Sequence, residues 1–216
     1  MSELDEQKLR NIKGYFDEKI ITHGANYKGV DYNNALRQFT YFEQLTKIIR
    51  DPASTFSLND FGCGYGALLA YLQERHYSVG AYVGYDFSQP MIDSAQELFQ
   101  AALPKVEFTT DKTRLVPQDY TIAGAIFNLK LEIDNEAWLQ HILGTLTSMW
   151  SLSTKGMAFN ILTKYSDADR MRPDLYYADP CFLFDYCKRN FSSEVALLHD
   201  YGIYEFTILV RRSANS

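Results

Sequence analysis

Apolar residues recur along the chain at two different spacings, and the spacing changes near residue 52. Over residues 3–20 and 33–49 they return every three or four positions, as on one face of an amphipathic helix. Asp51 and Pro52 end the second run, because the residue before a proline is disfavoured in a helix. Residues 1–52 therefore predict two helices joined by a loop at residues 25–32.

Beyond residue 53, short strand-like runs alternate with helical ones. The predicted strands span residues 55–60, 81–86, 105–110, 120–127 and 156–162. The predicted helices span residues 67–77, 90–103, 138–151 and 180–190, and Ser88 is a suitable N-cap for the second of them. The runs 193–199 and 204–211 flank a turn and predict an antiparallel hairpin. This order predicts an α/β fold, with a mainly parallel sheet covered by helices on both faces.

Size, charge and cysteine content narrow the class of protein. A chain of 216 residues with 46% hydrophobic residues suits one well-buried α/β domain, as a monomer or homodimer. The net charge of −6 disfavours nucleic acid as a partner. Neither a signal peptide nor a membrane-length apolar run is evident, so no membrane partner is expected. The three cysteines lack metal-ligand spacing, which favours a reduced, cytoplasmic protein without a metal site.

The segment from Asn59 to Gly66 is the most informative about function. An apolar approach leads to Asp60, three glycines follow at alternate positions, and a helical run begins directly afterwards. Glycine lets the backbone turn sharply and lie close to a ligand, and the helix start adds unpaired N–H groups. We therefore expect a nucleotide-like cofactor on this turn.

A second carboxylate helps to identify the cofactor. Asp86 ends the next predicted strand, where it can accept hydrogen bonds from both hydroxyls of a ribose, a contact that suits NAD and S-adenosylmethionine alike. The GxGxG spacing, the position of the turn well inside the chain and the C-terminal hairpin favour S-adenosylmethionine. An NAD(P)-dependent oxidoreductase is the first alternative.

With these features the chain resembles the class I S-adenosylmethionine-dependent methyltransferases of the small-molecule type. The matching segments are residues 60–66, 82–92, 119–128 and the final hairpin, so the resemblance extends over about residues 55–211. It implies a Rossmann-like, seven-stranded, mostly parallel sheet of order 3-2-1-4-5-7-6 with strand 7 antiparallel. It also implies an N-terminal helical lid (1–52) and a cofactor-binding core (53–216) within one structural domain.

The resemblance also implies the cofactor contacts. The glycines would lie against the methionyl end, Asp60 would hold the ammonium group, Asp86 would bind the ribose, and Phe87 and Met91 would pack near the adenine. The structural alternatives are that Asp60 caps the turn and that Phe87 and Met91 are core residues. The expected cofactor-binding residues are Asp60, Gly62, Cys63, Gly64, Gly66, Asp86, Phe87, Met91, Asp111, Lys112 and Asn128.

The reaction expected from this resemblance is in-line methyl transfer to nitrogen or oxygen of a small polar metabolite. Orientation and exclusion of water are the main contributions of such a protein, and a base is needed only if the acceptor must lose a proton. His23 is the candidate base and Asn128 a second candidate catalytic residue, whereas His141 is interpreted as structural or exposed. The alternative is a cofactor-binding protein without catalysis.

Acceptor contacts are expected in the lid and in the polar, aromatic stretch after residue 162, which is too long for a minimal connection. Arginine and tyrosine there suit a polar substrate, anionic ones included. The expected substrate-binding residues are Tyr27, Tyr32, Gln38, Asn160, Tyr165, Arg172, Tyr176 and Tyr177.

Overall fold

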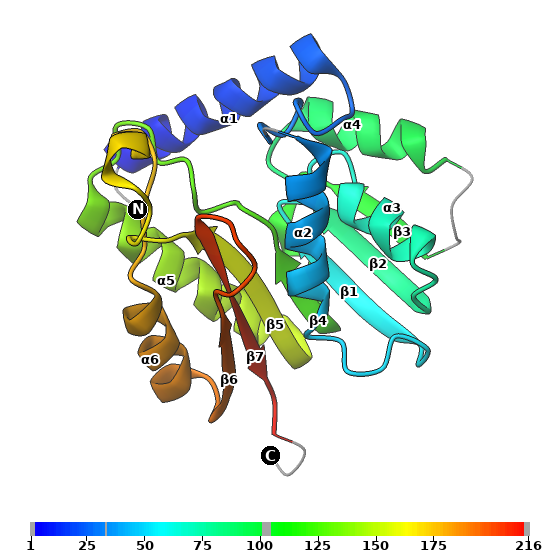
Figure 1. Ribbon diagram of the computed structural model, residues 1–216. Helices are drawn as coiled ribbons and strands as arrows, with labels where there is room; N and C mark the ends of the chain where they lie inside the picture. The colour runs from blue at the N-terminus through cyan, green and yellow to red at the C-terminus, as the bar shows by residue number, and fades with distance from the viewer. Residues whose placement is uncertain (1–2, 33, 101–104, 214–216) are drawn as a thin grey trace.

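The computed structural model describes residues 3–32, 34–100 and 105–213. One sheet runs through the molecule in the order β3-β2-β1-β4-β5-β7-β6 (Figure 1). Strands β1 to β5 pair in parallel, and β7 is antiparallel to both of its neighbours. This confirms the predicted order. The strands are β1 (Phe56–Phe61), β2 (Val79–Tyr85), β3 (Val106–Thr109), β4 (Gln118–Ala123), β5 (Ser153–Leu162), β6 (Glu194–Leu198) and β7 (Glu205–Arg211).

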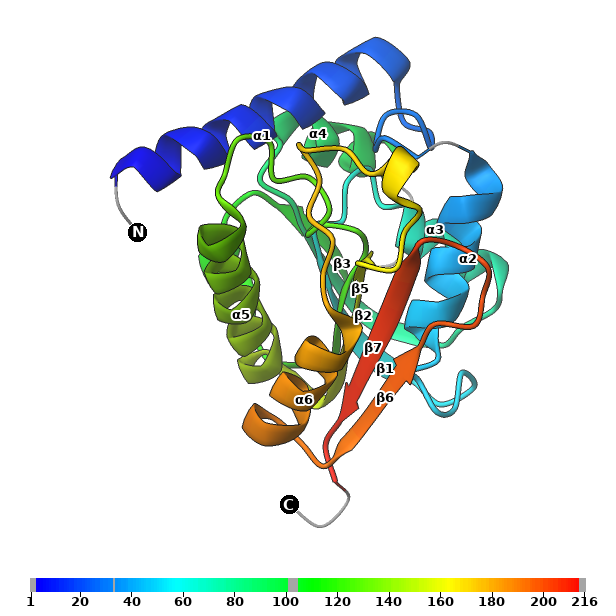
Figure 2. The ribbon, with the colours of Figure 1, turned by 60° about the vertical axis from the view of Figure 1, so that its left-hand side comes forward.

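Helices cover both faces of the sheet (Figures 1 and 2). Along β5, Met157 and Phe159 belong to the hydrophobic cluster under α5 and α6, whereas Ala158 belongs to the cluster under α2 and α3. This alternation follows from the two-residue repeat of a strand, and both faces are apolar because both are buried. The helices of these layers are α2 (Ala35–Thr46), α3 (Ala67–Glu74), α4 (Gln89–Leu98), α5 (Asn135–Ser151) and α6 (Pro180–Asn190).

Several helices begin at a side chain that accepts a backbone N–H. Ser88, the predicted N-cap of α4, accepts from Met91 N at 3.3 Å. Asp134 caps α5 and Asp179 caps α6 in the same way, at 2.8 Å and 2.9 Å. Such caps satisfy N–H groups that the first turn leaves unpaired.

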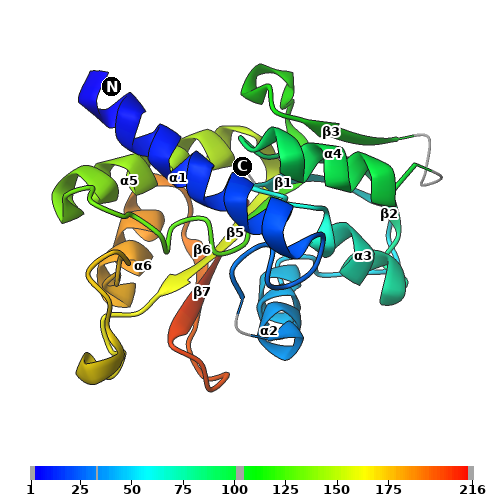
Figure 3. The ribbon, with the colours of Figure 1, turned by 90° about the horizontal axis from the view of Figure 1, so that it is seen from above.

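The first helix, α1 (Glu3–His23), lies across the carboxyl end of the sheet rather than on either face (Figures 1 and 3). Its Asp17 Oδ1 accepts a 2.5 Å hydrogen bond from the Ser88 hydroxyl at the start of α4. Its Phe16 ring meets the Phe87 ring edge to face at 6.4 Å. None of the helices in the described ranges is both long and apolar enough to cross a membrane.

The structure moves several predicted boundaries. β4 ends at Ala123 instead of residue 127, because Ala125 has φ 58° and leaves the strand conformation. Asn128, expected at the end of this strand, therefore lies in the loop after it. The helix expected over 33–49 ends at Thr46, and that over 90–103 ends at Leu98. Positions 33 and 101–104 lie outside the described residues.

Candidate active site

A cavity of about 560 Å³ opens at the carboxyl ends of β1, β2 and β4, beneath α1. We call it the crevice. β1 lies between β2 and β4, where the strand order reverses, and ligands of open α/β sheets bind at this position. The expected cofactor residues that line it are Asp60, Gly62, Cys63, Gly64, Asp86, Phe87, Met91 and Lys112.

The turn after β1 needs its glycines. Gly62 and Gly64 have φ of 84° and 53°, in the left-handed region that side chains disfavour. A Cβ on Gly62 would lie 2.3 Å from Ile126 Cγ2, so there is no room for one. Gly66 also has a φ of 84°, but it does not line the crevice. A Cβ there would lie 2.7 Å from the Phe99 ring, so this glycine permits core packing.

Asp86 links the turn to the next strand. Its Oδ2 accepts a 2.9 Å hydrogen bond from Gly64 N, and its Oδ1 accepts another of 2.9 Å from Ser88 N. Burial raises the pKa of Asp86 to about 6, although both hydrogen bonds favour the charged form. A ligand that donates hydrogen bonds here would therefore stabilise a carboxylate that is costly to ionise.

Asp60 is the second buried acid of the crevice. It is 3% exposed, and its Oδ2 accepts a 2.5 Å hydrogen bond from the Tyr82 hydroxyl. Burial raises the pKa of Asp60 to about 7, and the charge of Asp86 adds to the rise. The two carboxylates end neighbouring strands and face one cavity, so the crevice favours a cationic or hydrogen-donating ligand.

Two residues of α5 that line the crevice, Trp138 and His141, were not expected there from the sequence. His141, interpreted as structural or exposed, lines the crevice and stacks on Trp138 at 4.9 Å. Lys112 Nζ lies 5.1 Å from the centre of the Phe61 ring. Burial lowers the pKa of both Lys112 and His141. The three-residue spacing of Trp138 and His141 places them on one helix face, and this is the signal that could have found them.

Other expected site residues lie outside the crevice. Asp111 is exposed and caps a short 3-10 helix (Lys112–Arg114) through Thr113 N at 2.9 Å. His23 is the last residue of α1, and its side chain is exposed.

Among the expected acceptor residues, Tyr32 and Gln38 line the crevice and Tyr177 lines a second cavity. Those that line neither cavity are Tyr27, Asn160, Tyr165, Arg172 and Tyr176.

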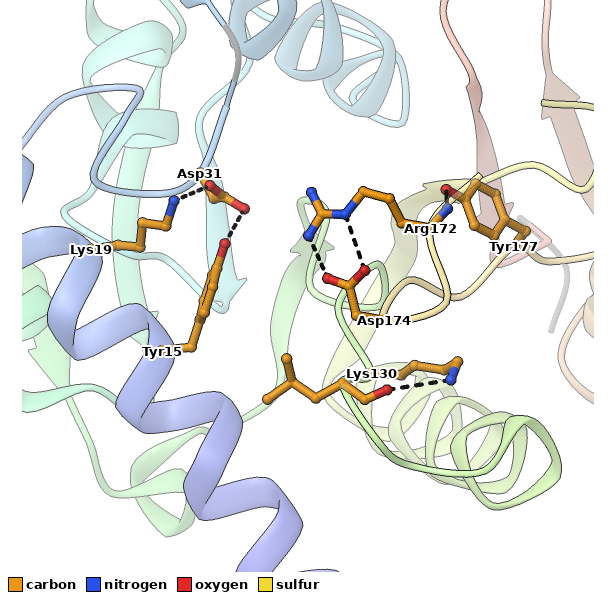
Figure 4. A network of polar contacts seen from close by, with 8 residues as sticks. Tyr15, Lys19, Asp31, Lys130, Arg172, Asp174 and Tyr177 are labelled. Carbon is orange, nitrogen blue, oxygen red and sulfur yellow. Dashed lines mark hydrogen bonds and ion pairs between the residues drawn. The ribbon is translucent and has the colours of Figure 1, made fainter. Parts of the chain in front are cut away.

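Figure 4 shows two small charged clusters that come from different segments of the chain. In one cluster, Tyr15 and Lys19 of α1 bind Asp31 at 2.7 Å each. In the other, Arg172 pairs with Asp174. The hydrogen bond to Asp174 raises the pKa of Arg172, and the more distant negative charge of Asp31 adds to the rise.

A buried polar cluster lies beside the crevice. Glu205, the first residue of β7, accepts hydrogen bonds from the side-chain amides of Asn128, at 3.1 Å, and Asn160. Asn128 Oδ1 accepts from Leu162 N at 3.0 Å, and Asn160 Oδ1 from Ala125 N at 2.7 Å. In both Asn128 and Asn160, the side-chain nitrogen and oxygen thus each have a hydrogen-bond partner within the protein.

Known proteins resemble this chain in sequence. Residues 59–148 match the family model described as a methyltransferase domain. Rv1506c of Mycobacterium tuberculosis, provisionally named a methyltransferase, is 48% identical over 166 residues, which are 77% of this chain and 99% of that protein.

Solved structures share the fold. Magnesium protoporphyrin IX methyltransferase of Synechocystis PCC 6803, solved with bound SAM, has a TM-score of 0.67 at 17% identity, covering 95% of this chain and 97% of that one. A SAM-dependent methyltransferase of Aquifex aeolicus has a TM-score of 0.60 at 18% identity, covering 85% and 95%. From its sequence relative and its seven-stranded fold, the chain belongs to the class I S-adenosylmethionine-dependent methyltransferases.

Proposed function

We propose that the crevice binds S-adenosylmethionine and that the protein transfers the methyl group to nitrogen or oxygen of a small polar metabolite. The observation that carries this proposal is the pair of buried carboxylates, Asp60 and Asp86, that face one cavity on either side of a glycine turn. The donor set fits the cofactor, because its ammonium group and ribose hydroxyls all donate hydrogen bonds. When bound, S-adenosylmethionine supplies a methyl group already activated on a sulfonium.

Different residues of the crevice would contact different parts of the cofactor. Asp60 would hold the ammonium group, and Asp86 would accept from the ribose hydroxyls. Gly62 and Gly64 would let the backbone approach the methionyl tail. Phe87 and Met91, which line the crevice at the start of α4, would pack on the adenine. Aromatic and sulfur-containing side chains suit a flat, polarisable ring.

The chain's contribution to the reaction is mainly orientation. Tyr32 and Gln38 line the crevice and would position the acceptor, and Gln38 Oε1 is itself held by the Tyr65 hydroxyl at 3.2 Å. Residues 1–52 would act as a lid over the core of residues 53–216, since α1 lies over the crevice and Phe16 meets Phe87 there. Fixing donor and acceptor and excluding water removes much of the entropic barrier to a bimolecular reaction.

Calorimetric titration separates this proposal from its alternatives. We expect S-adenosylhomocysteine to bind with one site per chain and NADH not to bind. Binding of NADH alone would point to an oxidoreductase. Turnover of S-adenosylmethionine with a panel of small amines, acids and phenols, followed by S-adenosylhomocysteine release, then tests for catalysis.

A further inference from the structure

A second cavity, of about 240 Å³, lies beside the crevice and is not explained by binding of the methyl donor. It is bounded by α2, by the loop after β5 and by the start of β7. We call it the side cavity. Its polar lining residues include Arg37, Tyr41, Arg170, Tyr177 and Glu205.

The inner wall of the side cavity carries a buried acid. Glu205 is 4% exposed, and burial raises its pKa to about 7, although hydrogen bonds from Tyr41, Asn128 and Asn160 favour the charged form. In the described part of the chain, Glu205 forms no ion pair within 4.0 Å, and Arg37 acts on it as a more distant charge. An ionised carboxylate offers about four acceptor sites, and these three side chains leave room for one further hydrogen bond from a ligand in the cavity.

Two guanidinium groups line the same space. Arg37, half-buried on α2, has no hydrogen bond or ion pair from its side chain among residues 3–32, 34–100 and 105–213. Arg170 lies 5.9 Å from the centre of the Tyr204 ring, and its Nε is 3.8 Å from Asp167 Oδ2, too far for a strong hydrogen bond. Both groups can therefore present their N–H donors to an anion.

From this arrangement we propose that the side cavity binds a small organic anion that also carries hydroxyl groups. The two guanidinium groups would hold its carboxylate or phosphate, as arginine does through paired N–H donors. A hydroxyl would donate to Glu205. Among the residues that line the cavity, two arginines stand against one carboxylate. Asp167, which faces Arg170 at 3.8 Å, does not line the cavity, so the preference for an anion depends mainly on Arg37. The proposal concerns this cavity alone and does not depend on the methyl-transfer function.

Four matched small molecules test separately the binding of the anionic group and the binding of the hydroxyl groups. Glycerate has a carboxylate and hydroxyls, and glycerol 3-phosphate replaces the carboxylate with a phosphate. Propionate lacks the hydroxyls, and glycerol lacks the charge. Each would be titrated into the ¹⁵N-labelled full chain without S-adenosylmethionine, following the backbone N–H resonances of Ser166 and Glu205.

We expect saturable binding of glycerate, glycerol 3-phosphate or both, and the stronger of the two identifies the preferred anion. Propionate should bind at least threefold more weakly, and glycerol should not saturate. Arg37→Met should weaken binding of the anion about tenfold, because it removes hydrogen bonds between charged groups. The control is Arg189→Met, which removes an exposed arginine on α6 that pairs with Asp185 at 2.7 Å.

A second variant tests the acid. Glu205→Gln keeps the shape of the side chain, so a melting temperature near that of the wild type would show an intact fold. In this variant the preference for glycerate over propionate should shrink toward equality. The proposal is overturned if neither anion saturates, if all four probes bind alike, or if Arg37→Met and Arg189→Met bind equally well.

Discussion

Gly64 donates its backbone N–H to Oδ2 of Asp86 at 2.9 Å, so the glycine turn after β1 and the carboxylate after β2 are held as one unit. The side chain that we assign to the ribose therefore also fixes the turn that we assign to the methionyl tail. Because Asp86 accepts from Ser88 N as well, it connects the turn to the start of α4, beside the proposed adenine contacts.

Replacing this carboxylate should weaken cofactor binding. We expect Asp86→Ala to lower the affinity for S-adenosylhomocysteine at least tenfold, because the variant loses the proposed ribose contacts and an anchor of the turn. Calorimetry measures the affinity. Asp93→Ala is a matched control, since Asp93 lies on the exposed side of α4, where it accepts a 2.7 Å hydrogen bond from the Gln89 side chain. Equal affinity in the two variants would contradict the ribose assignment.

The buried acids predict a pH dependence of stability. The pKa of Asp86 is raised to about 6 and that of Asp60 to about 7, above the value of 3.8 for a free side chain. For such groups the stabilising contribution is complete below the unfolded pKa and is lost as the pH rises through the folded pKa. We expect the free energy of unfolding of Asp60→Asn, relative to wild type, to rise between about pH 5 and about pH 8. Denaturant unfolding at several pH values measures it, and a flat difference would contradict the raised pKa.

Cofactor binding should respond to pH in the opposite direction. An ammonium group and ribose hydroxyls favour ionised carboxylates, so the affinity for S-adenosylhomocysteine should increase from about pH 5.5 to about pH 7.5. In Asp60→Asn this increase should be smaller, because one titrating acid is gone. Calorimetry at fixed ionic strength tests the prediction, and a loss of affinity over this interval would count against both assignments.

The helix over the crevice should slow cofactor release. Phe16→Ala removes the ring that meets Phe87, and aromatic pairs of this kind contribute about 0.5–1.5 kcal/mol. We expect S-adenosylhomocysteine to dissociate roughly two- to tenfold faster, as measured by stopped-flow fluorescence. Phe182→Ala on the exposed side of α6 is the control. Unchanged dissociation in Phe16→Ala would remove the support for a lid over residues 1–52.

Asn160 should matter for stability more than for acceptor binding. Its side chain joins Ala125 N to Glu205, so Asn160→Ala leaves two buried polar groups without this partner. We expect a loss of about 2–4 kcal/mol in the free energy of unfolding, from roughly 1–3 kcal/mol for each group. Asn190→Ala at the exposed end of α6 is the control. A stable Asn160→Ala protein with a raised KM for its acceptor would instead favour direct substrate contact.

The succession of strands and helices and the glycine turn could be predicted because their signals are local, whereas the order of the strands within the sheet followed from the family resemblance. Alternating runs and the close spacing of Gly62, Gly64 and Gly66 specify them within short segments. Boundaries were harder where apolar residues continue past the end of a strand. Phe127 is buried although β4 ends at Ala123, so the sequence pattern alone extends the strand too far.

The long-range parts of the site had no local signal. Glu205 meets Asn128 and Asn160 only after three segments, far apart in sequence, come together near the carboxyl end of β5. In the sequence it is one polar residue at the start of a strand. His141 lines the crevice because α5 packs beside β4. A helical sequence pattern predicts the helix but not the cavity that the helix will border.

A crystal structure with S-adenosylhomocysteine tests the central claim most directly. We predict that the ribose hydroxyls lie within hydrogen-bond distance of Asp86, with the amino-acid tail against Gly62 and Gly64 and its ammonium group near Asp60. Density for the ligand at another site, or a ribose turned away from Asp86, would contradict the account.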